Sequence, residues 1–111
     1  DVPVIITSAF AYPGEFDRFD AAYANAARLA EAGVRFAFGA AGRGDASLAK
    51  LLPLHAGVSI AYGLDPDRAV RALTLDAAAI LGVDDRMGSL EAGKIADVIV
   101  TTGHPCRADT R

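Results

Sequence analysis

The stretch LGVDDRMGSLEAGKIADVIV, residues 81–100, decides how the rest of the chain is interpreted. Its internal glycines, Gly88 and Gly93, suit turn positions, where a positive φ angle costs glycine little. The apolar run that follows predicts a strand over residues 96–101. The stretch therefore predicts a polar turn region that leads into a short return strand.

Polar residues surround that predicted strand. Lys94 and Asp97 are spaced to form a pair or a hydrogen bond across the turn. Beyond Gly103 the tail is polar, and we expect little regular structure in it.

Upstream of residue 81, short apolar strands alternate with helices. The expected order is β-α-β-α-α-α-β. The first two strands are joined by a helix, so they form one right-handed parallel unit. The expected elements are strands at residues 2–8 and 34–38 and helices at residues 21–32, 47–62, 66–74 and 74–81.

Local signals set the ends of these helices. Asp20 is positioned to cap the first helix, and Gly33 stands where its C-cap is expected. The run Asp65–Asp67 contains a capping Asp, a first-turn Pro and an acid favoured by the helix dipole. Pro53 and Gly57 predict a break inside the helix expected over 47–62.

Composition limits the classes of protein to which the chain can belong. Apolar residues make up 52% of it and charged residues 23%, which argues against disorder. The formal net charge of −3, with no basic run, gives no reason to expect a nucleic-acid partner. No apolar stretch approaches the roughly 20 residues of a membrane span, so we expect no membrane partner. Because the chain opens on Asp1, we expect a processed or truncated chain, and the compartment is left open.

Two parallel strands make a poor domain by themselves. Both faces of a parallel sheet need covering, and both of its edges would be open. We therefore expect a larger parent fold or a homo-oligomer that completes the sheet.

The most specific motif runs from residue 69 to residue 100. A helix AVRALTLDAAAIL is followed by the glycine-rich turn and the run GKIADVIV. This order resembles the C-terminal signature of the amidohydrolase superfamily, in its imidazolonepropionase and Xaa-Pro dipeptidase-like branch. Gly103-His104-Pro105 also stands where that family commonly has Gly-Asp-Pro, and Leu52–Gly57 resembles the opening of the helix after the eighth strand.

The resemblance implies an α/β fold that is part of a larger one. Residues 1–82 would be the last two β/α units of a (β/α)8 barrel. Residues 83–111 would be the turn, the return strand toward a small β-sandwich, and the tail. The resemblance gives the signature itself the role of a structural joint between barrel and sandwich.

The family resemblance also implies a metal-dependent hydrolase acting on C–N bonds in a cyclic amide or a dipeptide, with zinc expected in a full-length parent. Its usual histidine ligands follow strands that precede this chain. The eighth strand normally ends in an Asp, but the matching position here is Ala41. We therefore expect no cofactor and no confident metal or catalytic residue in this chain. Asp45 is the weak candidate, and it is more simply a helix cap.

A glycine-rich loop carries a rival hypothesis. Gly39, Gly42 and Gly44 follow a strand and precede a helix, which is the setting of a phosphate- or nucleotide-binding turn. The spacing differs from the G-x-G-x-x-G pattern, so the signal is weak. A non-catalytic structural or interaction module, which would complete its sheet by oligomerisation or complete a barrel supplied by another chain, is the second hypothesis and is placed ahead of this loop.

The remaining reactive side chains predict no site. His55 and His104 share no ligand spacing, and a structural or solvent-facing role is expected for each. The single Cys106 has no partner for an internal disulfide and no neighbouring base, so we expect no nucleophilic role.

Overall fold

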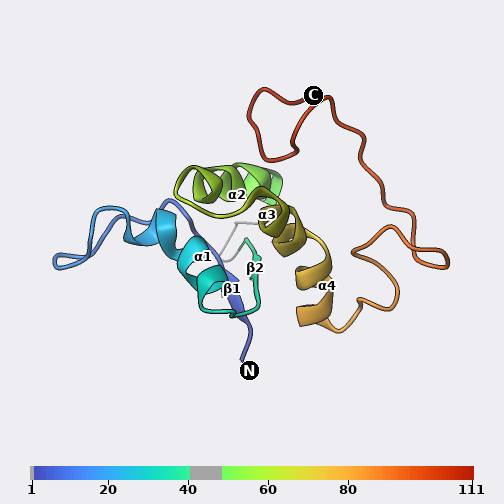
Figure 1. Cartoon of the computed structure of the whole chain (residues 1–111), viewed down its shortest axis with the longest axis horizontal. Helices are drawn as coiled ribbons and strands as arrows, with labels where there is room; N and C mark the ends of the chain where they lie inside the picture. The colour runs from blue at the N-terminus through green and yellow to red at the C-terminus, as the bar shows by residue number, and fades with distance from the viewer. Residues whose placement is uncertain (1, 41–48) are drawn as a thin grey trace.

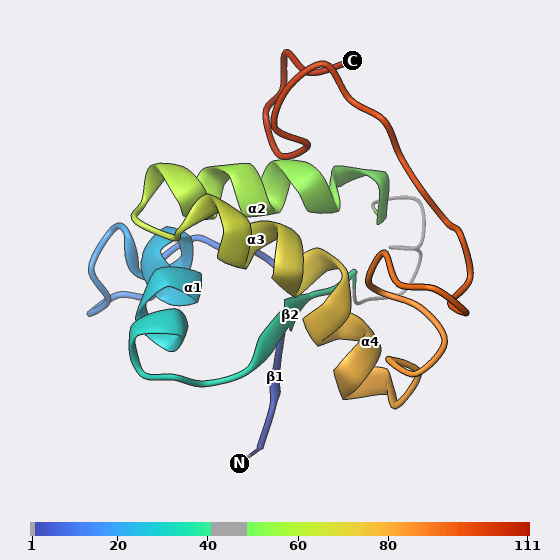
Figure 2. The ribbon, with the colours of Figure 1, turned by 45° about the vertical axis from the view of Figure 1, so that its right-hand side comes forward.

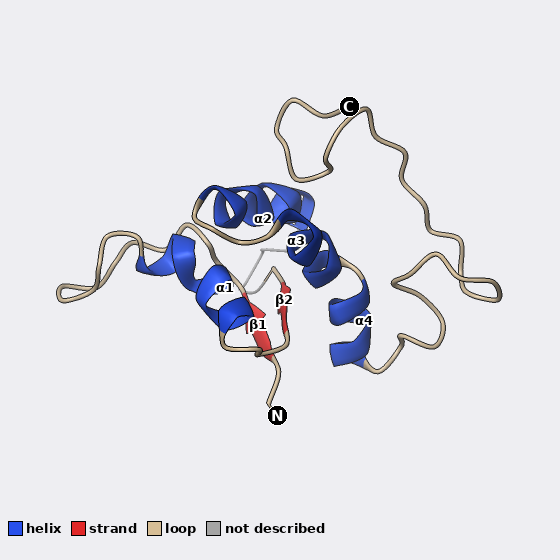
Figure 3. Cartoon of the chain, viewed as in Figure 1, coloured by secondary structure: helices blue, strands red, loops and turns tan. Residues whose placement is uncertain are grey.

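A computed structural model describes residues 2–40 and 49–111 of the chain. Figures 1 and 3 show two short strands at the centre, with helices around them and a long C-terminal loop region at one side. The elements are β1 Val4–Ile6, α1 Ala21–Glu31, β2 Phe36–Phe38, α2 Leu52–Ala61, α3 Pro66–Leu73 and α4 Leu75–Leu81.

The two strands form a parallel pair, as the sequence predicts. Val4 lies opposite Phe36, and Ile6 lies opposite Phe38. All three residues of β2 are buried, whereas the middle residue of β1, Ile5, is 51% exposed. In Figure 2 the helices gather around β2, and β1 lies at the edge of the pair. The sheet is thus covered on the β2 side and open on the β1 side.

The helix ends follow the local signals in part. Asp65 caps α3 as predicted, because its side chain accepts a hydrogen bond from the Arg68 N–H at 3.0 Å. The predicted cap at Asp20 is wrong: its carboxylate binds the Arg18 guanidinium at 3.1 Å and caps nothing. Gly33 follows the end of α1 with a φ of 69°, a conformation that glycine adopts without strain.

Helix α2 differs from its predicted form. It begins at Leu52, and Pro53 falls in its first turn, where a proline costs no hydrogen bond. Gly57 lies in the helix interior without breaking it. The break predicted at these two residues is therefore wrong.

Alanine dominates the helix faces that meet the core. Small side chains allow helices to approach closely, and the few large side chains come mainly from the strands. The largest fully buried hydrophobic side chain is Phe36. The buried core cluster consists of Ile6, Ala26, Ala27, Phe36, Phe38, Ala56, Leu64, Ala69, Ala72 and Cys106.

The return strand predicted over residues 96–101 does not form. Residues 95–101 have no regular structure and no sheet partner among the residues that the structure describes. Val98, Ile99 and Val100 are 54%, 77% and 92% exposed. A strand needs a neighbour to pair with its backbone, and the described parts of this chain supply none.

The turn and the tail also depart from expectation. Lys94 does not pair with Asp97: its ammonium donates to Ser89 Oγ at 2.7 Å and lies 3.4 Å from Glu91. The tail is ordered by its own hydrogen bonds, and Cys106 is only 4% exposed. The tail contains no helix or strand, as expected, but its hydrogen bonds and the burial of Cys106 order it more than its polar sequence predicts.

Over the described ranges, the structure contains no helix with the length and apolarity needed to span a bilayer.

Candidate functional site

The carboxyl ends of β1 and β2 meet at one edge of the sheet. The Gly39 N–H donates to the Ile6 carbonyl at 3.0 Å and extends the ladder by one bond. A Cβ atom at Gly39 would lie 2.7 Å from Cγ2 of Ile5, so the close approach requires glycine here. In parallel α/β folds, this edge is where ligands bind.

An aromatic contact joins the described parts of the two polypeptide segments that leave this edge. Phe10 follows β1, and His55 lies in the first half of α2, the helix that comes after β2. Their rings meet edge to face, with centroids 4.7 Å apart and planes at 87°. The contact holds the start of α2 against the segment after β1.

The His55 ring has one unsatisfied nitrogen. Its Nδ1 is buried and has no hydrogen-bond partner within the described structure. Burial also lowers the pKa of His55 below its ordinary value, so the neutral imidazole is favoured. The neutral ring keeps one donor and one acceptor, which suits a polar partner at this edge.

His104 and Cys106 lie together in the tail. The Cys106 N–H donates to Nδ1 of His104 at 3.3 Å, and Nε2 of His104 is buried without a partner among the described residues. Burial raises the pKa of the Cys106 thiol, which keeps it protonated and unreactive. These features agree with the structural role expected for His104 and with the absence of a nucleophilic role expected for Cys106.

The weak candidates of the glycine-rich loop fall mostly outside the described residues. Asp45, Gly42 and Gly44 belong to residues 41–48, as does Ala41. Gly39 is described, and its amide is used in the β ladder rather than being free for an anion. The phosphate-binding loop and the role of Asp45 stay predictions.

A metal does not fit the residues in view. Within residues 2–40 and 49–111, no three His, Cys, Asp or Glu side chains converge on one point. Three protein ligands are the usual minimum for a catalytic metal. The described residues would therefore need ligands from elsewhere.

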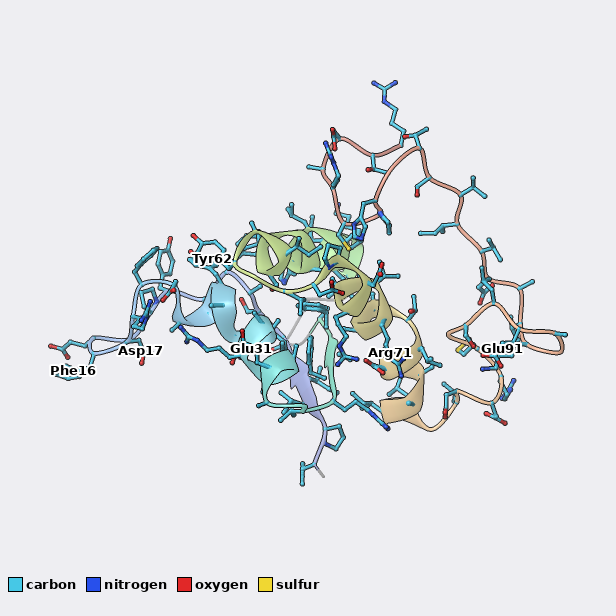
Figure 4. All side chains as sticks on the ribbon, in the orientation of Figure 1. Phe16, Asp17, Glu31, Tyr62, Arg71 and Glu91 are labelled. Atoms are coloured by element: carbon cyan, nitrogen blue, oxygen red, sulfur yellow. The ribbon has the colours of Figure 1, made fainter. Side chains whose placement is uncertain are left out.

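A buried carboxylate is the polar feature that the sequence does not reveal. The Asp76 side chain accepts from Nε of Arg71 at 2.9 Å and from a guanidinium nitrogen of Arg68 at 3.4 Å. Arg68 also lies over the Phe36 ring, 5.9 Å from its centroid. Figure 4 shows Arg71 beside the junction of α3 and α4. Two arginines one helical turn apart, followed by an acid, are the only local signal, and it does not predict burial.

An apolar groove runs between α4 and the segment after it. Its volume is about 490 Å³, and Asp97 is the one charged residue in its lining. No metal-binding histidine or cysteine faces it. The groove therefore suits an apolar polypeptide better than a metal or a polar substrate. Its apolar lining includes Leu73, Leu81, Met87, Ile95, Val98 and Ile99.

By its fold, the chain is a parallel β/α segment. Its two strands end side by side at one edge, and helices lie over one side of the pair. Comparison with known proteins then gives the family. The amidohydrolase family profile matches residues 12–110, almost the whole chain. The chain therefore belongs to the amidohydrolase family, whose members are generally metal-dependent.

The similar relatives are imidazolonepropionases. The chain is 36% identical over 96 residues to the imidazolonepropionase of Symbiobacterium thermophilum, which covers 85% of the chain and 23% of that relative. It is 47% identical over 38 residues to the enzyme of Erwinia tasmaniensis, covering 34% of the chain and 9% of the relative. The chain spans at most about a quarter of the relatives it matches.

A solved structure supports the same assignment. The crystal structure of an amidohydrolase from Thermotoga maritima superimposes with a TM-score of 0.70 and is 28% identical in sequence. The match covers 88% of this chain and 26% of that one. The imidazolonepropionase-like resemblance seen in the signature is thereby confirmed.

Proposed function

We propose that the chain is the C-terminal portion of a metal-dependent hydrolase of C–N bonds, and that it is inactive by itself. The observation that carries this proposal is that residues 12–110 match the family, while the chain covers only 23% of the Symbiobacterium thermophilum relative and 26% of the Thermotoga maritima structure. The chain would supply the last two β/α units of a (β/α)8 barrel and the segment that returns toward a small β-sandwich.

The described residues would supply only part of the active site of such a hydrolase. A metal, with zinc as the expected ion, would activate the attacking water, and its ligands would come from other parts of the protein. This chain would contribute the edge formed after β1 and β2. There Phe10 and the neutral His55 would shape and line the rim of the site.

Zinc content and hydrolysis test the proposal directly. The purified chain, mixed with zinc and a cyclic amide substrate, should retain no stoichiometric metal after dialysis and should hydrolyse nothing above the buffer rate. A longer protein that carries the preceding strands and their histidines should do both. A tightly held zinc in the short chain, lost in His55→Ala or Asp45→Asn, would overturn the claim of inactivity.

A non-catalytic module is the second candidate, because one observation favours a polypeptide partner. The apolar groove and the unpaired segment Val98–Val100 expose side chains that folded proteins usually cover. In the first proposal the remainder of the barrel and sandwich covers them. In the second, another copy of this chain does so. Light scattering on a size-exclusion column separates the two, since the second requires a stable homo-oligomer and the first does not.

A further inference from the structure

The last ten residues form a closed loop. The Thr102 N–H donates to the Arg111 carbonyl at 2.9 Å, and the Arg111 N–H returns a bond to Thr102 Oγ1 at 3.3 Å. Inside the loop, Thr110 Oγ1 donates to the His104 carbonyl at 2.8 Å. These bonds fix the loop without any regular secondary structure.

The loop lies directly against α2. Cys106 reaches the buried core cluster that also contains Ala56 of α2. A Cβ atom added to Gly57 would clash with the backbone carbonyl oxygen of Cys106. Backbone therefore meets backbone at this point, and only glycine leaves the necessary space. Figure 1 shows the C-terminal loop folded back toward α2 after the long excursion of residues 83–101.

The opposite side of α2 is held as well. His55 and Gly57 are two positions apart, so their side-chain directions differ by about 200° around the helix. His55 packs on Phe10, which follows β1. The first half of α2 thus contacts the tail on one side and the carboxyl edge of the sheet on the other.

We infer that residues 102–111 act as a strap that positions the first half of α2, and with it the His55–Phe10 contact at the carboxyl edge of the strands. The strap is a positioning element: its contact with the core is made at α2, through Cys106 and Gly57. Its relevance to catalysis rests on the proposed function, because that edge is where a barrel hydrolase would hold its substrate. The claim that residues 102–111 position α2 does not depend on any catalytic activity of the chain.

Gly57→Ala is the decisive variant, because two effects of opposite sign meet there. Alanine is favoured over glycine in a helix interior, so without a strap the variant should be more stable and otherwise unchanged. With the strap, the new methyl group expels the Cys106 backbone. The rate at which iodoacetamide alkylates Cys106 should then rise about tenfold or more. Leu54→Ala, on an exposed side of the same helix, is the matched control and should leave the rate unchanged.

Nuclear magnetic resonance supplies the second readout. In the unmodified chain, ring protons of Phe10 and His55 should show a nuclear Overhauser contact, which should weaken in Gly57→Ala and persist in Leu54→Ala. Thr110→Val, which removes one bond inside the loop and leaves α2 untouched, should raise the alkylation rate to a smaller extent.

Each result decides part of the inference. Unchanged protection of Cys106 in a folded Gly57→Ala chain would overturn the strap. Exposure of Cys106 with an intact Phe10–His55 contact would overturn the coupling to the edge. If Gly57→Ala fails to fold, Thr110→Val carries the test, and unchanged protection in that variant overturns the strap. None of these measurements requires hydrolysis, so failure of the proposed function leaves them readable.

Discussion

Two apolar runs of this chain differ in secondary structure and in burial. Phe36-Ala37-Phe38 forms β2, with all three side chains buried, beneath helices that pack on it. Val98-Ile99-Val100 lies in the open, unpaired and more than half exposed. By composition both are plausible strands. The difference is that β2 has β1 beside it and helices over it, whereas the second run has no such neighbours in the part of the chain that the structure describes. Strand formation here depends on partners and not on the run itself.

Truncation of one residue in each run tests the difference in their burial and has the largest expected effect. Phe36→Ala should lower the free energy of unfolding by about 3–5 kcal/mol, because it empties a fully buried aromatic site. Ile99→Ala should change it by less than about 0.5 kcal/mol, since the side chain is already in water. Urea unfolding followed by circular dichroism measures both. Equal costs would mean that the second run is packed in solution.

A smaller effect is expected at the junction of α3 and α4. Asp76→Ala removes a carboxylate that is buried against two arginines, and should lower the free energy of unfolding by about 1.5–3 kcal/mol. High salt should reduce this loss only in part, because the carboxylate is buried while the two arginine side chains are 36% and 52% exposed. Asp109→Ala, which breaks the fully exposed pair with Arg107, is the control and should leave unfolding unchanged.

Ile99→Lys tests whether the second run is exposed, and it should leave the stability of the chain unchanged. The substitution places a charge in the middle of the exposed apolar run, so it should reduce binding of a hydrophobic dye and any self-association of the chain. Fluorescence with the dye and light scattering measure the two effects, while the urea midpoint should not move. A shifted midpoint would show that Ile99 packs inside the folded chain.

The smallest effect concerns pH. Burial places the pKa of His55 in the folded chain below the value of 6.5 expected when the chain is unfolded. Unfolding therefore takes up a proton in the window below that value, and the contribution of the neutral ring is present above pH 6.5 and declines as the pH falls. His55→Gln should flatten the dependence of stability on pH below about pH 6.5. An unchanged slope in this variant would assign the dependence to another group.

Much of the fold could be predicted, because its signals are local. The strands β1 and β2, their parallel order and the four helices follow from apolar runs, Pro66, Asp65 and Gly33. The family followed from the signature after residue 69. The prediction of a return strand was wrong because strand pairing is not a local property of the sequence. The burial of Asp76, the Phe10–His55 contact and the docking of Cys106 on Gly57 were not predictable, since each joins residues that only the folded chain brings together. The assignment of residues 1–82 and 83–111 to separate parts, and the role of Asp45, remain predictions.

The place of Cys106 has a consequence for how this chain is made. Synthesis proceeds from the N-terminus, so β1, β2 and the helices α1 to α4 emerge before Cys106, which joins their core. Until residues 102–111 leave the ribosome, a small apolar slot beside Gly57 stays open to water. A premature stop within those residues would release a chain that contains α1 to α4 but leaves their core open to water, a species that chaperones and proteases would recognise.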